Sequence, residues 1–285
     1  MSLQPTDPQA PGANATSRIS RWPRLRSLLA FGRAPAGLST LFVQKDSAWA
    51  WEPPRSRHDT PVAPVRYDSV SDWIATHEGQ RARVLLSAEL QHQMVLRDDA
   101  LPLHDEAALV AYARHQFVHF HGSAAEHWPL AVWADKRKRG ACALHGLDLP
   151  ALTEQARRRS VRIATVLPWW ACALGAATRC DATLAQAERA GLLLVEGGLL
   201  TCLTIERGAV VDLELRHMDE ATLAAARAAA SEWHEEHADS RTTVLLAGYG
   251  LTAVDTPLPA SSSLRVLGTL NALAAAHPPF EWVHP

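Results

Sequence analysis

The sequence lacks the short motifs that mark the common nucleotide-dependent and hydrolytic enzymes. It contains no G-x-x-x-x-G-K-[ST] phosphate loop, no G-x-G-x-x-G fingerprint and no G-x-S-x-G nucleophile elbow. It has only four cysteines, and none of them forms a C-x-x-C pair. A chain of 285 residues does not need disulfides to be stable, so we interpret these cysteines as reduced, buried thiols of a cytosolic protein.

Long apolar segments are also missing. The longest uncharged run covers residues 163–178, contains Pro168 and Gly175, and is shorter than the ~20 residues that a membrane-spanning helix needs. Residues 1–11 are polar and proline-rich, without the basic-then-apolar order of a signal peptide. We therefore expect a soluble, intracellular protein with no transmembrane span and no complete catalytic motif.

The composition is that of a globular protein with an uneven distribution of charge. Hydrophobic residues make up 47% of the chain, and there are ten tryptophans against three tyrosines and five phenylalanines. Residues 1–36 carry a net charge of +4, so the remainder carries −6 of the total of −2. A nucleic-acid-binding protein needs a basic face on its folded part, so we expect no nucleic-acid partner.

Apolar periodicity and turn residues predict a mixed α/β protein with two similar halves. The pattern predicts strands at residues 38–43, 48–51, 84–87, 94–96, 130–134, 161–167, 192–195, 199–205, 210–215 and 243–246. It predicts helical segments at 72–77, from Asp105 onward, and at 148–159, 219–236 and 264–275. The three strands after Gly191 are separated by glycine-containing turns and form a β-meander.

Two groups of histidines invite a metal-binding interpretation. His115, His119 and His121 lie close together, and the first two would share one helix face if the helix continued past Val118 and Phe120. The sequence HEEH at residues 234–237 differs from a zincin helix because its histidines are three residues apart. We favour a structural role for both groups and predict no metal site.

Four acidic residues lie nearest the expected strands: Asp46, Glu89, Asp212 and Glu214. Paired carboxylates can hold Mg²⁺ when they converge from different strands. Asp212 and Glu214 are two residues apart on one strand, so the simpler interpretation is the polar side of a half-exposed strand.

Two basic segments are candidate surfaces for an acidic partner. The first is the amphipathic stretch RISRWPRLRSLLAFGR, in which the proposed contact residues are Arg18, Arg21, Trp22, Arg24 and Arg26. The second is a run that looks like a solvated turn between strands: Lys136, Arg137, Lys138 and Arg139. The first segment is equally compatible with contact to an anionic membrane surface or with a frayed tail.

The order of elements resembles a known family. The helix DEAALVAYARHQF, the strand WPLAVWADKRKR, the segment DLPALTEQARRRSVRIATVLPWW and the meander VEGGLLTCLTIERGAVVDLEL follow one another. This order is similar to that of the cytoplasmic domain of the type II secretion protein GspL and of the type IV pilus assembly protein PilM. The resemblance covers about two-thirds of the chain and rests on the order of elements.

The resemblance implies a two-lobed, actin-like (ribonuclease H-like) fold with mixed sheets and flanking helices. We expect a disordered basic segment at 1–36, a first lobe at 37–180 and a second lobe with the meander at 181–285. It implies a non-catalytic cytoplasmic scaffold at the inner membrane, linking membrane subunits of an assembly platform to an assembly ATPase. Because the chain ends at Pro285, a PilM-like subunit tethered through a partner is the closer model, and a homo-oligomer stays open.

Actin-like nucleotide binders carry glycine-rich phosphate turns and an acid on the first strand of each half. The corresponding positions in this sequence form a degenerate nucleotide site: Glu196, Gly197, Gly198, Gly248 and Gly250. The first hairpin, LFVQKDSAW, lacks the Asp-x-Gly order. We therefore expect no cofactor, and keep an actin-like ATP-binding protein or ATPase as the alternative.

Overall fold

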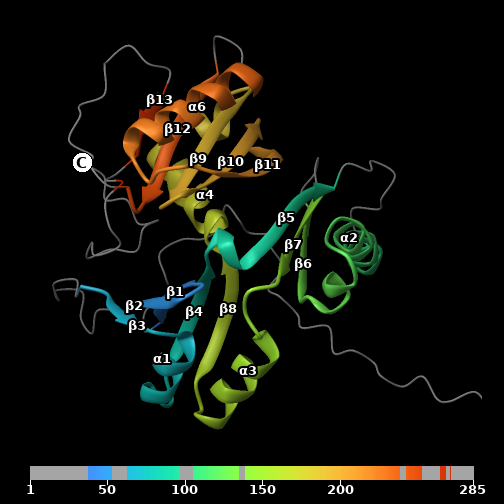
Figure 1. Ribbon diagram of the computed structural model, residues 1–285, viewed down its shortest axis with the longest axis vertical. Coiled ribbons are helices and arrows are strands. Elements are labelled where there is room, and N and C mark those ends of the chain that lie inside the picture. Colours follow the sequence, from blue (N-terminus) through green and yellow to red (C-terminus); the bar gives the residue numbers. More distant parts are fainter. Residues whose placement is uncertain are drawn as a thin grey trace, which may run out of the picture.

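The computed structural model describes residues 38–52, 63–96, 105–134, 139–237, 242–251, 264–267 and 270. Two five-stranded mixed sheets and one three-stranded sheet account for its strands (Figure 1). Each five-stranded sheet is the centre of one lobe, and the three-stranded sheet belongs to an insertion in the first lobe. None of the helices in these ranges is long and apolar enough to cross a membrane.

The first lobe is built on a sheet of order β3-β2-β1-β4-β8. Its strands are β1 (Ser39–Gln44), β2 (Ser47–Trp51), β3 (Val65–Tyr67), β4 (Arg81–Leu86) and β8 (Arg162–Pro168). β1, β2 and β3 form an antiparallel meander, whereas β4 runs parallel to both β1 and β8. Two helices, α1 (Val70–Thr76) and α3 (Leu149–Arg158), pack on this sheet and bury Trp73 and Leu152 in its core.

The second lobe repeats the topology of the first. Its sheet has the order β11-β10-β9-β12-β13. Its strands are β9 (Ala190–Glu196), β10 (Leu199–Glu206), β11 (Ala209–His217), β12 (Thr243–Tyr249) and β13 (Leu264–Val266). The meander is again antiparallel, and β12 is again parallel to both of its neighbours. Helix α6 (Leu223–His237) covers one face of this sheet, and the short α5 (Thr183–Gln186) precedes β9. This duplicated order is that of a two-lobed actin-like fold and confirms the predicted fold class.

An insertion lies between β4 and α3. Its elements are η2 (Ala88–Leu90), β5 (Gln91–Leu96), α2 (Glu106–His121), η3 (Ser123–His127), β6 (Leu130–Ala134) and β7 (Arg139–Leu144). The three strands form an antiparallel sheet of order β5-β7-β6. Helix α2 covers one face, where Leu109 and Phe117 are buried. On the other face Trp133 and Cys142 join the core between the lobes.

Helix α4 (Trp169–Cys180) follows β8 directly and lies where the two lobes meet (Figure 1). Its first nine residues are all buried, and they belong to a hydrophobic core that includes Phe42 of the first lobe and Leu194 of the second. The sequence predicted a strand ending at Pro168 but no helix after it. Alanines and the other small residues of this segment favour a helix that lets the lobes approach closely.

Two other expectations differ from the structure. Residues 264–275 were expected to form a helix, but Leu264–Val266 is strand β13, parallel to β12. Leu264 and Val266 pack against the core of the second lobe, and a short apolar run does not by itself distinguish a strand from a helix. Helix α2 continues through Val118 and Phe120 to His121. Ala113 and Phe117 are buried on its inner face.

Candidate functional site

The predicted degenerate nucleotide residues do come together in space. Glu196 and Tyr249 are paired in the register of β9 and β12, and the amide of Gly197 donates to the Tyr249 carbonyl at 3.0 Å. Gly248 has a φ of +127°, and a Cβ there would lie 2.1 Å from the Val195 carbonyl oxygen. The glycine is therefore required by the close approach of two strands of the second lobe.

Glu196 is the centre of this site, and its carboxylate is almost fully buried, with 7% of the residue exposed. The Ser87 hydroxyl donates to Oε2 at 2.5 Å, and the Ala88 amide donates to both oxygens at 3.1 Å. The Trp169 indole N–H donates to Oε1, and the Tyr249 hydroxyl donates to Oε2 at 3.4 Å. Ser87 and Ala88 follow β4 in the first lobe, so this carboxylate of the second lobe is held largely by the first.

Burial dominates the electrostatics of this carboxyl group. Desolvation raises the pKa of Glu196 to about 7, although the hydrogen bonds from Ser87, Trp169 and Ala88 act in the opposite direction. The nearby Glu89 also raises it. The pKa of the Tyr249 hydroxyl is raised as well, first by burial and then by the charge of Glu196.

Three aromatic rings pack beside the carboxylate. The centroids of Phe42 and Tyr249 are 5.3 Å apart, those of Trp169 and Tyr249 are 5.9 Å apart, and those of Phe42 and Trp169 are 6.2 Å apart. All three pairs meet edge to face. Protein side chains therefore fill the space between the lobes around Glu196.

Gln44 of the first lobe occupies the position that Glu196 has in the second. Each is the last strand residue before a two-residue hairpin turn: Gln44 pairs with Ser47, and Glu196 pairs with Leu199. The Gln44 amide donates to the Tyr249 hydroxyl at 3.3 Å. The first half thus has a neutral amide where the second has a carboxyl group.

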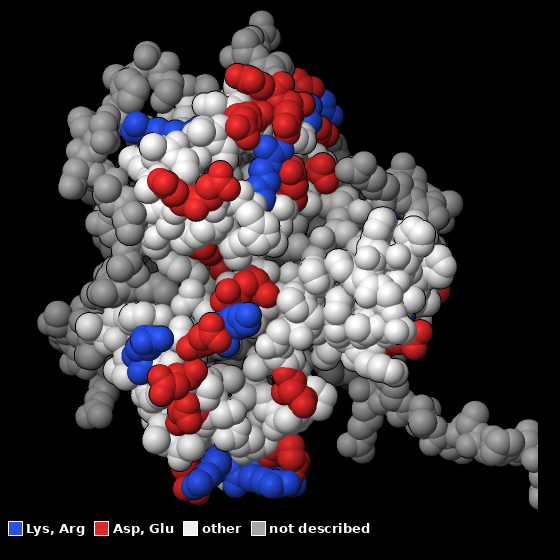
Figure 2. All heavy atoms as spheres, viewed as in Figure 1, with Lys and Arg blue, Asp and Glu red and all other residues white. Residues whose placement is uncertain are grey.

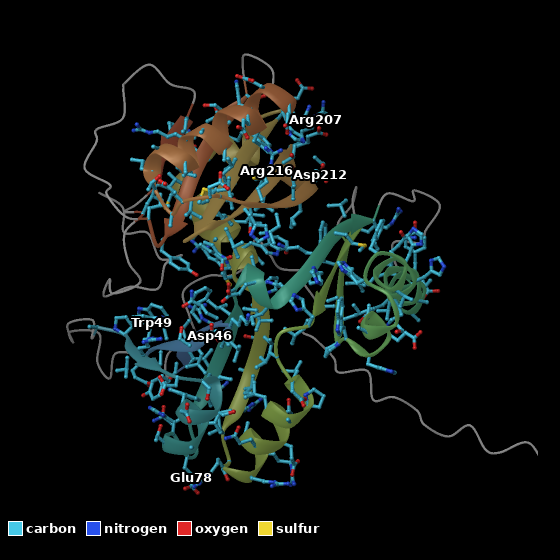
Figure 3. The ribbon with its side chains drawn as sticks, in the orientation of Figure 1. Asp46, Trp49, Glu78, Arg207, Asp212 and Arg216 are labelled. Carbon is cyan, nitrogen blue, oxygen red and sulfur yellow. The ribbon has the colours of Figure 1, made fainter. Side chains whose placement is uncertain are left out.

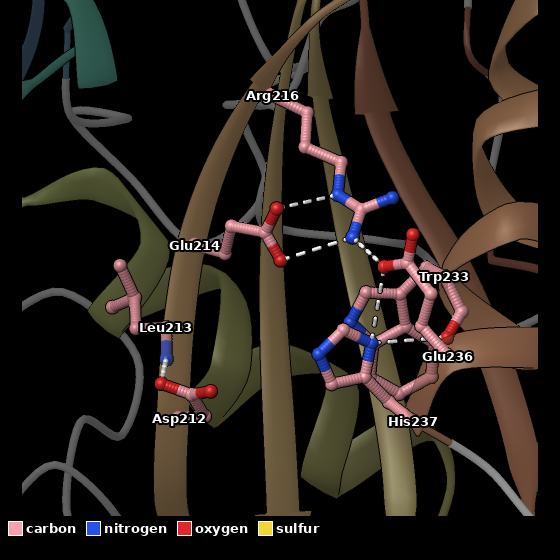
Figure 4. A network of polar contacts seen from close by, with 7 residues as sticks. All are labelled: Asp212, Leu213, Glu214, Arg216, Trp233, Glu236 and His237. Atoms are coloured by element: carbon pink, nitrogen blue, oxygen red, sulfur yellow. Dashed lines mark hydrogen bonds and ion pairs between the residues drawn. The ribbon is translucent and has the colours of Figure 1, made fainter.

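The four acids near strands do not converge. Asp46 is exposed in the β1–β2 turn, and Glu89 accepts the backbone amide of Lys45 at 2.6 Å (Figure 3). On β11, Asp212 accepts the amide of Leu213 at 3.0 Å. Glu214 forms a two-pronged ion pair with Arg216, at 2.7 and 3.1 Å (Figure 4).

Arg216 also bonds to Glu236 of α6, so this network ties the outer strand of the second sheet to its helix (Figure 4). The carboxylates of Glu214 and Glu236 therefore have a structural cation between them. Across the ranges that the structure describes, no group of three or more histidines, cysteines and acids could hold a metal ion.

The histidine-rich segment of α2 contributes to a different feature, a stack of imidazoles. His92 of β5 lies between His121 and His145, with ring centroids 3.9 and 4.2 Å away, and also stacks on Trp128 at 5.2 Å. Burial, followed by the charges of the neighbouring His145 and His121, lowers the pKa of His92 to about 4. Rings stacked face to face do not point their nitrogens at a common position, so this stack is a packing arrangement.

A cavity of about 440 Å³ adjoins this stack. It lies at the junction of the insertion with the start of α3. The residues that line it include His127, Trp128, Pro129, Leu147, Asp148 and Pro150. No sequence pattern predicts this pocket, because folding brings residues 127–129 together with residues 144–150.

The predicted partner-binding residues have mixed outcomes. Arg18, Arg21, Trp22, Arg24, Arg26, Lys136, Arg137 and Lys138 lie outside the described residues. Arg139 begins β7 and is only 6% exposed, so the prediction of a solvated turn is wrong there. It is buried because it pairs with Leu96 and Ala134 on either side in the small sheet.

The duplicated sheet order and the core shared by the two lobes define an actin-like fold. No family model matches the sequence, and no curated protein matches it. Solved structures that are similar include a chain of the PilM–PilN type IV pilus biogenesis complex, with a TM-score of 0.53 at 11% identity. That match covers 82% of this chain and 89% of the other.

Two further structures are similar. One is the cytoplasmic domain of EpsL, an inner membrane component of the type II secretion system of Vibrio cholerae (TM-score 0.47, 14% identity, 82% of this chain and 87% of that chain). The other is a protein of unknown function with an actin-like ATPase fold from Bacteroides thetaiotaomicron (TM-score 0.49, 11% identity, 76% and 83%). At 11% identity, the likeness to the chain of the PilM–PilN complex shows a shared fold.

Proposed function

We propose that this protein is a non-catalytic adaptor of a type IV pilus or type II secretion assembly platform. In this role it sits at the cytoplasmic face of the inner membrane through a membrane subunit and links that subunit to an assembly ATPase. The likeness to a chain of the PilM–PilN complex supports this class of role. The observation that carries the proposal is the cavity beside Trp128.

The cavity has the character of a peptide-binding pocket. At about 440 Å³ it is large enough for one or two side chains of a partner. Its wall combines one indole, two imidazoles, two prolines and two leucines. Tryptophan is the residue type most enriched at energetically important positions of protein interfaces. The occupant we propose is a short apolar segment from the cytoplasmic part of a membrane subunit.

The surface around the insertion fits this role. Figure 2 shows that the described residues on the side formed by the insertion (right) carry few charged atoms, whereas those of the second lobe carry many. Phe120 of α2 is 66% exposed. The core of a protein interface is depleted in charged residues and enriched in aromatic ones, so the insertion is the most suitable docking side in this view.

Binding of synthetic peptides tests this proposal. The probes are peptides that cover the cytoplasmic segments of the pilus or secretion membrane subunits of the same organism, measured by fluorescence anisotropy. We expect one of them to bind, and Trp128→Ala to weaken binding at least tenfold. His127→Ala, which removes a more exposed part of the wall, should weaken it less.

Trp49→Ala is the matched control, because Trp49 is also a half-buried tryptophan but lies on β2, far from the cavity (Figure 3). This variant should bind the peptide with an affinity within twofold of that of the wild type. Equal binding by the wild type and Trp128→Ala, or no binding by any of these peptides, would contradict the proposal.

The alternative function is an actin-like ATP-binding protein. It is favoured by one observation, the gathering of Gly197, Gly248 and Gly250 next to an acid. Against it, Glu196 is already bonded to protein donors and aromatic rings fill the surrounding space. We therefore infer that the inter-lobe site holds no nucleotide.

A further inference from the structure

The donors around Glu196 form an anion site that is built from one part of the chain and filled by another. The Ala88 amide and the Trp169 indole N–H can only donate hydrogen bonds, and the Ser87 hydroxyl donates here as well. Ser87 and Ala88 belong to the first lobe and Trp169 begins the helix between the lobes. The group that they bind comes from the second lobe, across 109 residues of sequence.

The duplicated topology shows that this contact has a counterpart. Val43 pairs with Leu86 in the first lobe, and Val195 pairs with Gly248 in the second, so Ser87 and Tyr249 are equivalent positions. Gln44 and Glu196 are equivalent as well. Gln44 bonds to Tyr249, and Ser87 bonds to Glu196.

The residue before each hairpin turn therefore bonds to the end of the central parallel strand of the opposite lobe: Gln44 to the end of β12, and Glu196 to the end of β4. In one of these reciprocal contacts the hairpin residue is a neutral amide with a single bond to Tyr249. In the other it is a carboxyl group with bonds to Ser87, Ala88 and Trp169. The second contact is the more extensive of the two, because three protein donors bond to one carboxyl group.

We propose that the Glu196 carboxyl group latches the two lobes together by occupying the site formed by Ser87, Ala88 and Trp169. We call this arrangement the lobe latch. It holds the lobes in one relative position without a bound ligand. It also excludes small carboxylates and phosphate from the same donors.

Chemical rescue tests the latch. Glu196→Ala leaves the three donors in place but removes the carboxyl group, so the variant should melt at a lower temperature than the wild type. Sodium formate or acetate at tens of millimolar should then raise its melting temperature by several degrees. The wild type, whose site is filled, should respond no more to formate than to sodium chloride of equal ionic strength.

The distance between the lobes provides a second readout. Spin labels at Glu78→Cys and Arg207→Cys report it, because both residues are exposed and lie at opposite ends of the molecule (Figure 3). The background is Cys180→Ser, since Cys142, Cys172 and Cys202 are buried. We expect a narrow distance distribution for the wild type, a broader one for Glu196→Ala, and narrowing when formate is added.

Equal responses of the wild type and Glu196→Ala to formate, or an unchanged distance distribution in the variant, would overturn the latch. If Glu196→Ala does not fold, Trp169→Phe and Ser87→Ala replace it, since each removes one donor and keeps most of the packing. A broadened distance distribution in these variants then supports the latch, and a distribution like that of the wild type overturns it. These outcomes do not depend on the Trp128 pocket, so the latch and the proposed adaptor role can fail separately.

Discussion

At the scale of single residues, Glu196 shows how burial and hydrogen bonding oppose each other at one carboxyl group. Four protein donors favour its charged form, yet removal from water has the larger effect and its pKa rises to about 7. A glutamate that binds its proton more tightly in the folded state than in the unfolded state makes the stability of the protein depend on pH.

The sign of this dependence follows from the raised pKa. Below the unfolded value of 4.5 Glu196 is protonated in both states, and its contribution to stability is fully present. As the pH rises through about 7 this contribution is lost, and the free energy of unfolding falls by about 3 kcal/mol in total. Glu196→Gln cannot titrate, so urea unfolding between pH 5 and pH 8 should show a smaller fall in stability for this variant than for the wild type. Parallel curves for the two proteins would contradict the raised pKa.

A second prediction for a single residue concerns the effect of replacing Gly248 on stability. Gly248→Ala should destabilise the protein by about 3 kcal/mol or more, because it combines a φ of +127° with a Cβ placed 2.1 Å from the Val195 carbonyl oxygen. Gly79→Ala is the control, since Gly79 also has a positive φ, of +73°, but no atom lies within 4 Å of an added Cβ. It should cost only about 1–2 kcal/mol. Urea unfolding measures both, and equal losses would show that the close approach at Gly248 has no effect.

At the scale of elements, the insertion packs its histidines against one another. His92 on β5 stacks between His121 at the end of α2 and His145 after β7, and the pKa of His92 is lowered first by burial and then by these two neighbours. The pKa of His145 is lowered too, first by burial and then by His121. The stack therefore favours the neutral forms of His92 and His145, and His145 lines the Trp128 cavity.

Acid should weaken the insertion through His92. With a folded pKa of about 4, below its usual 6.5, His92 contributes stability that is present above pH 6.5 and lost as the pH falls through about 4. His92→Phe keeps a ring in the stack and removes the charge, so it should lose less stability between pH 7 and pH 5, by on the order of 1 kcal/mol after allowing for solvent screening. His119→Phe, exposed on α2, should behave like the wild type. Hydrogen exchange of the β5 and β7 amides at both pH values measures this, and identical protection in His92→Phe and wild type would contradict it.

Local chemistry explains which elements could be predicted from the sequence. Glu196-Gly197-Gly198 and Lys45-Asp46-Ser47 identify the hairpin turns, and Asp105 and Asp148 cap α2 and α3 as expected. Helix α4 was missed because it is defined by packing between the lobes. Strand β13 was mistaken for a helix because three residues are too few to reveal a period.

The candidate site was only half predictable for the same reason. Glu196 and its glycines are neighbours in sequence or lie on paired strands, so they could be found from the pattern of a resembling fold. Ser87, Ala88 and Trp169 could not, because nothing local links them to a residue in the other lobe. Arg139 was misplaced because a charged run predicts exposure, whereas the sheet register decides it.

At the scale of the whole molecule, two copies of one topology face each other across a core that belongs to both. Phe42 and Leu85 of the first sheet, Trp169 of α4 and Leu245 of the second sheet lie in a single hydrophobic cluster. The reciprocal contacts of Gln44 and Glu196 add polar links to this core. We propose that protein groups fill the place between the lobes that corresponds to the ligand site of actin-like nucleotide binders.

A thermal-shift titration with Mg-ATP tests this claim most directly. A ligand that binds only the folded protein stabilises it by about 2.7 kcal/mol at 100 times its Kd. At roughly 2–4 °C per kcal/mol for a protein of this size, the melting temperature should rise by roughly 5–10 °C. We predict no concentration-dependent rise for the wild type up to millimolar Mg-ATP. A rise of several degrees that is abolished by Glu196→Gln would contradict the account and identify an ATP-binding protein.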